Sequence, residues 1–326
     1  MTRANLSIVG ARRSDRTSRT SRRDRPQKAR NFQVPRWAVG YVFIAPAILY
    51  FVVLDIYPLI STVLMSFTDV KAGVLHQVGL AQYQELFQDR WFWNSVRISV
   101  VFSIASTCLH LTVGLSLALL LNENWPSTTL RNVLRGVFIL PYAFSTASCA
   151  TMWGLLYHAF GVLNYMAITY LHVPGPIEFL SPDTALVALI IVNAWKSYPF
   201  YLITILGGLQ SIPQDLYEAA KVDGASAFGR FRHITLPLLR QVLVIVSTID
   251  LIATMGAMDL VNILTQGGPM RSTETLAYYI YTQGIQDGNL GYGAAVSTVM
   301  LTAMLILASI YLRMLTRGGE SGETSF

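Results

Sequence analysis

The chain has 326 residues, of which 53% are hydrophobic and only 13% carry a charged side chain, and its mean hydropathy is +0.46. Soluble domains contain roughly 25% charged residues, so this chain has about half of the charge that a water-facing surface needs. The composition therefore excludes a secreted soluble enzyme, a disordered protein and a disulfide scaffold, and it indicates a polytopic membrane protein.

The segment that precedes the first apolar stretch is strongly basic. Residues 1–36 contain 11 of the 24 Lys and Arg residues and only two acids. They show no apolar periodicity, so we predict a disordered cytosolic tail, and the apolar stretch that follows is too long for a cleaved signal peptide. We interpret the charge as a cytosolic retention signal that touches anionic lipid, in preference to a nucleic-acid-binding arm.

Six apolar stretches are each long enough to cross a hydrocarbon core of ~30 Å as a helix, which takes about 20 residues. They are too long and too continuously apolar for the strands of a barrel. The spans are predicted at residues 39–67, 95–121, 133–157, 184–209, 239–264 and 291–315. The predicted fold is therefore an all-α membrane protein, with a transmembrane domain over 37–317 and a C-terminal tail at 318–326. Pro141 is expected to bend the third span.

The orientation follows from the positions of the basic residues. With the N-terminus in the cytosol, 19 of the 24 fall on the cytosolic side, four on the external side and one, Lys196, within a span. Lys and Arg accumulate in cytosolic loops, so both termini are predicted to be cytosolic.

The cysteines and histidines show no pattern of a metal or redox site. Cys108 and Cys149 fall in spans two and three, where we interpret them as small buried residues. His110, His158 and His172 lack ligand spacing, so we interpret them as isolated residues and predict no metal site.

The cytosolic loop between the fourth and fifth spans predicts an elbow of two short helices. Pro213 and the acids after it favour a helix start, Gly224 lies where a left-handed helix end is expected, and Ser226 suits the cap of a second helix that precedes Pro237. A short, firm projection of this kind suits docking to a soluble partner. An ordinary loop on the membrane surface is the alternative.

The residues of this elbow carry a family resemblance. Glu218-Ala219-Ala220, then Gly224 after three residues, and Ile234–Pro237 after nine more match the EAA loop of binding-protein-dependent ABC importer permeases. Leu264–Pro269, with the sequence LTQGGP, resembles a turn typical of the first of two paired permeases. The chain after the tail resembles the carbohydrate-uptake permeases of the maltose-transporter type.

The resemblance implies a type I ABC importer permease fold in a bacterial inner membrane, with the coupling (EAA) loop at 211–238. It implies three partners: a second related permease in a heterodimer, an ABC ATPase dimer and an extracytoplasmic solute-binding protein. The chain has no G-x-x-x-x-G-K-[ST] phosphate loop, so we expect no directly bound cofactor, ATP hydrolysis on a separate subunit and no enzymatic activity of its own. The residues expected to couple to the ATPase are Glu218, Ala219, Ala220, Asp223 and Gly224.

Two charges stand out within the spans. Lys196 and Asp250 each lie roughly 17–18 Å deep, counted at 1.5 Å per residue, near the middle of the membrane. Ionisable residues at this depth are expensive and usually functional. Two interpretations stay open, namely a structural ion pair between two spans and a polar solute site.

The resemblance favours the solute site. Maltose-type permeases contact the sugar through residues of the fourth and fifth spans, which correspond here to Asn193, Lys196, Ser197, Phe200, Asp250, Ala253 and Thr254. The charges at Lys196 and Asp250 depart from the mostly neutral maltose-type site, so maltose itself is in doubt. Another sugar remains compatible, because hydroxyl groups accept from Lys and donate to Asp.

The predicted function is a permease subunit that forms half of the translocation path for a carbohydrate, such as a disaccharide or oligosaccharide, delivered by a binding protein. The same machine could instead import a polyol or a glycerol-phosphate-type solute. A membrane receptor or enzyme is the third alternative, but we find no pair of catalytic acids, metal motif or nucleophile with its base.

Overall fold

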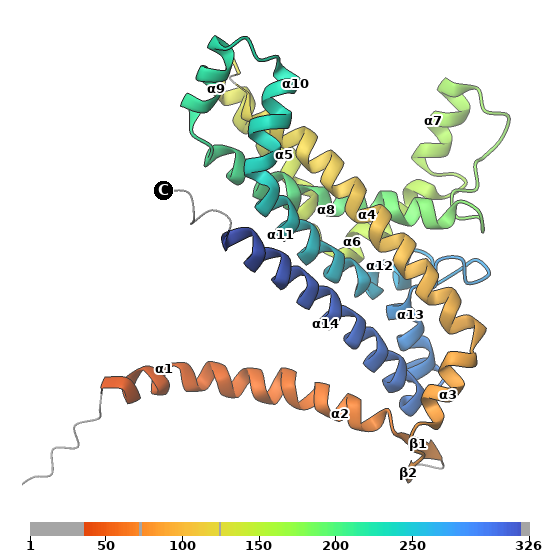
Figure 1. Ribbon diagram of the computed structural model, residues 1–326. Coiled ribbons are helices and arrows are strands. Elements are labelled where there is room, and N and C mark those ends of the chain that lie inside the picture. Colours follow the sequence, from red (N-terminus) through yellow and green to blue (C-terminus); the bar gives the residue numbers. More distant parts are fainter. Residues whose placement is uncertain (1–35, 72–73, 124, 321–326) are drawn as a thin grey trace, which may run out of the picture. The chain divides into compact units, whose positions relative to one another are not determined.

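The computed structural model describes residues 36–71, 74–123 and 125–320, most of which are helical (Figure 1). The predicted basic tail, except Arg36, lies outside these residues, as does the end of the predicted C-terminal tail at 321–326. The chain divides into two units, Met1–Val53 and Leu54–Phe326. The described part of the first unit is α1 (Arg36–Phe51) and the start of the π-helical turn η1 (Val52–Ile56).

The second unit contains all of the other elements. Its helices are α2 (Tyr57–Met65), α3 (Ala81–Gln88), α4 (Arg90–Asn122), α5 (Thr128–Ala143), α6 (Thr146–Tyr157), α7 (Val162–Leu171), α8 (Ala185–Gln210), α9 (Gln214–Val222), α10 (Ala227–Arg230), the π-helical turn η2 (Phe231–Thr235), α11 (Leu236–Met255), α12 (Met258–Leu264), α13 (Leu276–Tyr281), the π-helical turn η3 (Thr282–Gln286) and α14 (Leu290–Glu320). One antiparallel hairpin, β1 (Thr68–Lys71) and β2 (Val74–Gln77), pairs Thr68 with Gln77.

Five helices of the described chain are long and apolar enough to cross a membrane, and a bent pair brings the number to six. The pair is α5 with the helical stretch Thr146–Leu171, and the bend between them is 97°. α5 ends at Ala143, two residues after Pro141, which confirms the bend expected at this proline. The hydroxyl of Ser145 then caps α6 by accepting from the amide of Ser148 at 3.1 Å. The predicted fifth span is also two helices, because α11 ends before Gly256 and α12 begins at Met258.

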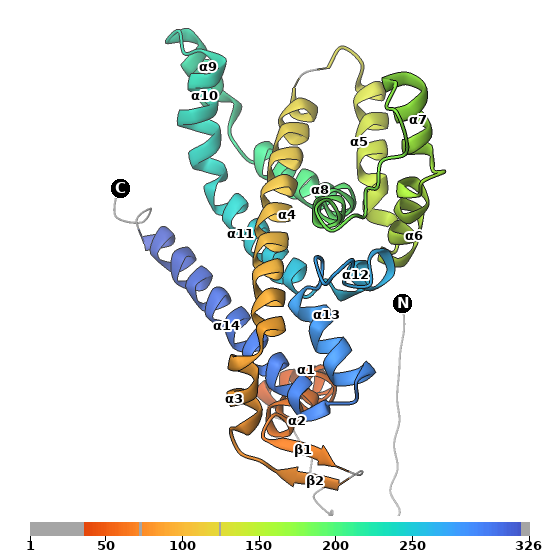
Figure 2. The same cartoon turned by 90° about the vertical axis from the view of Figure 1, so that its right-hand side faces the viewer.

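The centre of the second unit is the crossing of α4 and α8, which lie side by side (Figure 2). The two backbones approach closely at Gly114, where a Cβ would lie 2.4 Å from the Cβ of Tyr201 and 3.1 Å from the amide nitrogen of Leu202. A small residue at a crossing lets two helices approach to this distance. Large side chains around it, among them Tyr201, Leu202 and Leu239, are fully buried.

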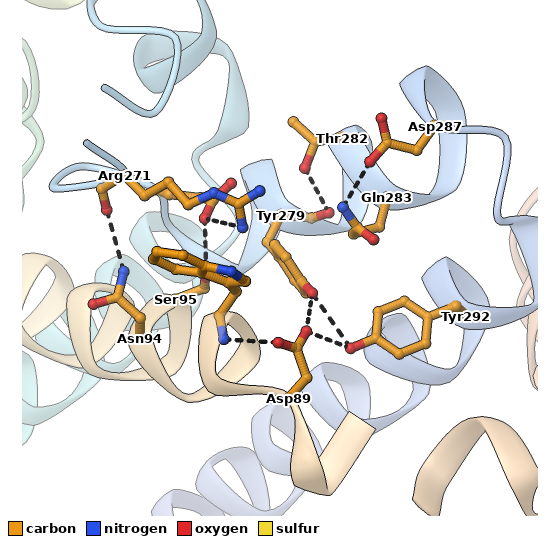
Figure 3. A network of polar contacts seen from close by, with 11 residues as sticks. Asp89, Asn94, Ser95, Arg271, Tyr279, Thr282, Gln283, Asp287 and Tyr292 are labelled. Atoms are coloured by element: carbon orange, nitrogen blue, oxygen red, sulfur yellow. Dashed lines mark hydrogen bonds and ion pairs between the residues drawn. The ribbon is translucent and has the colours of Figure 1, made fainter. Parts of the chain in front are cut away.

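A polar network ties the start of α4 to α13 and α14 (Figure 3). The carboxylate of Asp89 caps α4 by accepting from the amide of Trp91 at 2.8 Å, and it accepts from the hydroxyls of Tyr292, at 2.8 Å, and Tyr279. Burial alone would raise the pKa of Asp89, but the hydrogen bonds from Tyr279, Trp91 and Tyr292 outweigh it and lower the pKa.

A second part of this network holds the loop before α13. The guanidinium of Arg271 lies 4.5 Å from the ring centroid of Trp91 and 3.4 Å from the carboxylate of Glu274. Burial raises the pKa of Glu274, and the charge of Arg271 opposes that rise. The ring contact with Trp91 and the hydrogen bonds that Asn94 and Ser95 donate to the carbonyl of Arg271, at 3.2 Å, and the carboxylate of Glu274, at 3.4 Å, fix the loop to α4.

Candidate solute site and coupling surface

One cavity of the second unit collects most of the residues predicted to face a solute. The cavity has a volume of about 280 Å³ and lies between α8, α11 and the breaks that precede α6 and α12. Its lining includes Asn193, Lys196, Ser197, Asp250, Ala253 and Thr254. These residues come from two helices but face one space.

Phe200 does not line this cavity. It lies one helical turn, about 6 Å along the axis, beyond Lys196, and its ring stacks on Tyr142 with the centroids 6.3 Å apart and an interplanar angle of 15°. The structure therefore places this aromatic residue against α5 and not beside the predicted polar residues.

The breaks in the spans contribute residues that the sequence analysis missed. Thr146 comes from the start of α6, and residues 256–260, including Asp259, come from the break between α11 and α12. Gly256 inside an apolar run was a signal for such a break, because glycine weakens a helix interior. A broken helix also brings backbone groups to the cavity, which a continuous helix would keep bonded to itself.

Asp250 and Lys196 form no ion pair within the described chain, although both line the cavity. Asp250 instead pairs with His110 of α4, whose Nδ1 lies 2.8 Å from Oδ2 of the carboxylate. The open alternative of a Lys196–Asp250 pair is therefore wrong for this structure, and so is the interpretation of His110 as an isolated residue.

Two further side chains complete the surroundings of Asp250. The hydroxyls of Thr107 and Tyr201 donate to the same Oδ2 at 3.1 and 3.0 Å. Asn193 lies at the limit of hydrogen-bond distance, 3.5 Å, from Nε2 of His110. The cluster joins α4, α8 and α11 at the wall of the cavity, and both His110 and Asp250 are buried.

The predicted cytosolic elbow is formed by α9 and α10. Gly224 has φ +79°, the left-handed conformation expected for the end of α9, and the hydroxyl of Ser226 caps α10 by accepting from the amide of Gly229 at 3.1 Å. Tyr217 ties α9 to η2, because its hydroxyl lies 3.0 Å from that of Thr235. The elbow is thereby attached to the helix that carries Asp250.

The second short helix differs from the prediction in one respect. Residues Ala227–Met255 run as one helical stretch, so α10 is the first turn of the fifth span. The π-helical turn η2 accommodates Pro237, which lacks the amide that a regular α-helix would use.

The predicted coupling residues are accessible on this elbow. Glu218, Ala219, Asp223 and Gly224 are exposed and Ala220 is half-buried. Val222 is 88% and Phe228 70% exposed. Apolar side chains this open, next to an exposed acid, form a surface of the kind that a protein partner covers.

The described part of the chain holds no group of three or more His, Cys, Asp and Glu side chains arranged for a metal ion. Cys149 is buried as the sequence predicted, whereas the prediction that Cys108 is buried is wrong, because its side chain lies on an exposed face of α4.

Comparison with known proteins agrees with this architecture. Residues 111–318 match the family described as binding-protein-dependent transport system inner membrane component. The chain is 35% identical over 280 residues to the trehalose/maltose transport system permease protein of Thermococcus litoralis, covering 85% of this chain and 93% of the relative. It is 32% identical over 300 residues to the sulfoquinovosyl glycerol transport system permease protein of Agrobacterium fabrum, covering 87% and 95%.

A solved structure shares the fold. A chain of a bacterial alginate ABC transporter, solved with an alginate pentasaccharide-bound periplasmic protein, superposes with a TM-score of 0.74 at 24% identity, covering 86% of this chain and 94% of that chain. The fold is thus that of an ABC importer permease, as the resemblance implied, and the relatives named here are sugar-transport permeases. The chain belongs to the family of binding-protein-dependent transport system inner membrane components.

Proposed function

We propose that this chain is the permease subunit of an ATP-driven importer and forms half of the translocation path for a carbohydrate. As a permease it is a transport component and not an enzyme, and ATP is hydrolysed on a separate subunit. Two relatives are named as permeases for trehalose and maltose and for sulfoquinovosyl glycerol, which supports a sugar as the cargo of this chain.

The observation that carries the proposal is the polar cavity within the spans. Asn193, Ser197 and Thr254 offer amide and hydroxyl groups, and Lys196 and Asp250 offer a donor and an acceptor. A solute that carries many hydroxyl groups satisfies both kinds of partner at once. An apolar solute would leave buried polar groups without partners, which costs free energy.

The partners follow from the two ends of the molecule. The exposed elbow with Glu218, Ala219, Ala220, Asp223 and Gly224 docks with an ABC ATPase dimer, and both chain termini lie on the same cytosolic side of the inner membrane. A solute-binding protein delivers the sugar on the opposite side. A second related permease completes the cavity in a heterodimer, and the chain itself binds no cofactor.

The test is reconstitution of the chain with its second permease, ATPase and binding protein in proteoliposomes. A panel of neutral disaccharides and oligosaccharides is screened for uptake and for ATPase stimulation by the loaded binding protein. We expect at least one carbohydrate to give both signals. A response to polyols or glycerol phosphates, with no response to any carbohydrate, would contradict the proposal that the solute is a carbohydrate.

A further inference from the structure

The carboxylate of Asp250 is held asymmetrically. All three of its hydrogen bonds, from His110, Thr107 and Tyr201, are made to Oδ2, and none of the described residues bonds Oδ1. An ionised carboxylate only accepts, so Nδ1 of His110 and both hydroxyls donate. Asp250 also lines the cavity, and Oδ1 is the oxygen left for it.

His110 contributes the shortest of these three bonds, at 2.8 Å, from a ring that is fully buried. On the other side of the ring, the amide of Asn193 lies 3.5 Å from Nε2, and the ring lies beside Tyr201, with the centroids 5.8 Å apart. One helical turn further along α4, the close backbone contact at Gly114 fixes this face of α4 against α8. The imidazole therefore has little freedom to leave the carboxylate.

Thr107 and His110 precede residue 111, where the family match begins. The matched range thus includes Asp250 and Tyr201 but not Thr107 or His110.

We propose that His110 is a positioning residue for solute binding, an inference that rests on the proposed function. It holds Oδ2 of Asp250 against α4, so that Oδ1 faces the cavity and accepts from a hydroxyl group of the sugar. The same contact keeps Asp250 from turning to Lys196, so that the carboxylate and the ammonium group both stay available to the solute. Without His110, the two charges can pair and close part of the cavity.

The transport test compares His110→Phe, which removes the donor, with His110→Asn, whose amide nitrogen can occupy nearly the position of Nδ1. His158→Asn, on the exposed residue after α6, is the matched control. In the reconstituted importer, with a carbohydrate that wild type transports, we expect His110→Phe to raise KM about tenfold or more, the range for a lost hydrogen bond to a charged group. His110→Asn should stay within about threefold of wild type.

A double-mutant cycle separates positioning from general structure. In an Asp250→Asn background, His110→Phe should add less than about twofold to KM, because its effect acts through the carboxylate. Full additivity of the two substitutions, or equal KM values for His110→Phe and His158→Asn, would overturn the proposal.

A second measurement needs no solute. The complex is labelled with ¹⁵N-histidine in lipid bilayers, and the signal of His110 is assigned by its loss in His110→Asn. We expect a protonated Nδ1 whose resonance shifts in Asp250→Asn. An unchanged resonance in Asp250→Asn would overturn the positioning role of His110, whether or not the importer transports a carbohydrate. Failure to transport any carbohydrate would contradict the proposed function and not this contact.

Discussion

The close crossing of α4 and α8 at Gly114 allows the destabilisation caused by one substitution to be worked out in advance. In Gly114→Ala, the new methyl carbon would lie 2.4 Å from the Cβ of Tyr201, and it would also meet backbone atoms of Leu202 at 3.1 Å and Tyr198 at 3.2 Å. Ordinary carbon–carbon contacts begin at about 3.5 Å. The helices must therefore separate by roughly 1 Å, because no flexible side chain can move aside.

Overpacking of this kind costs about 1–3 kcal/mol, and each kcal/mol lowers the melting temperature by about 2–4 °C in domains of roughly 150–250 residues. Thr107 lies on α4 and Tyr201 on α8, so a separation of roughly 1 Å also lengthens at least one of their hydrogen bonds to Asp250, which measure 3.1 and 3.0 Å. We expect a lower melting temperature of the purified complex and a raised KM for the transported sugar.

Gly136→Ala is the matched control, because Gly136 also lies inside a helix but has no atom within 4 Å of its added Cβ. Alanine is the better helix former, so this variant should melt at the wild-type temperature or slightly above it. If Gly114→Ala melts and transports like Gly136→Ala, the close crossing and the account of how His110 is held are both wrong.

Three other predictions concern the two ends of the molecule. Gly224→Ala should weaken the coupling of ATP hydrolysis to uptake, because a left-handed residue other than glycine costs about 1–2 kcal/mol, whereas Gly229→Ala should not; equal coupling ratios in both would count against a rigid elbow. Glu218→Lys should lower uptake by reversing the charge on the ATPase-facing surface, and unchanged uptake with the ATPase still bound would argue against that role. The pKa of Asp89 is lowered from 3.8, so the wild-type protein should melt at a higher temperature than Asp89→Asn above pH 3.8. The difference should disappear as the pH falls further below that value. A difference that persists at low pH would show that the charge of the carboxylate does not stabilise the fold.

Hydropathy and turn residues predicted much of the fold. The long apolar runs marked the spans, Pro141 marked the bend between α5 and α6, and Gly224 with Ser226 marked the elbow. Each of these signals is local, because proline and glycine act on the backbone at their own positions.

The parts that could not be predicted depend on contacts distant in sequence. His110 and Asp250 are 140 residues apart, and a single histidine in an apolar helix has no periodicity that would reveal its partner. The family resemblance placed Phe200 at the solute site together with Lys196, yet its ring packs against Tyr142 of α5. Tertiary packing, and not helical spacing alone, decides which residues share a cavity.

The central claim is that the cavity between α8, α11 and the helix breaks is the path of the solute. Ala253, exposed on its wall, is replaced by Cys in a background of Cys108→Ser and Cys149→Ala, with Phe160→Cys, at a residue 93% exposed, as the control. The reconstituted importer is then treated with a membrane-impermeant thiol reagent, with and without the transported sugar.

We predict that modification of Ala253→Cys stops uptake, that the sugar slows the modification, and that modified Phe160→Cys still transports. Normal uptake by fully modified Ala253→Cys, or a modification rate that the sugar does not change, would contradict the claim.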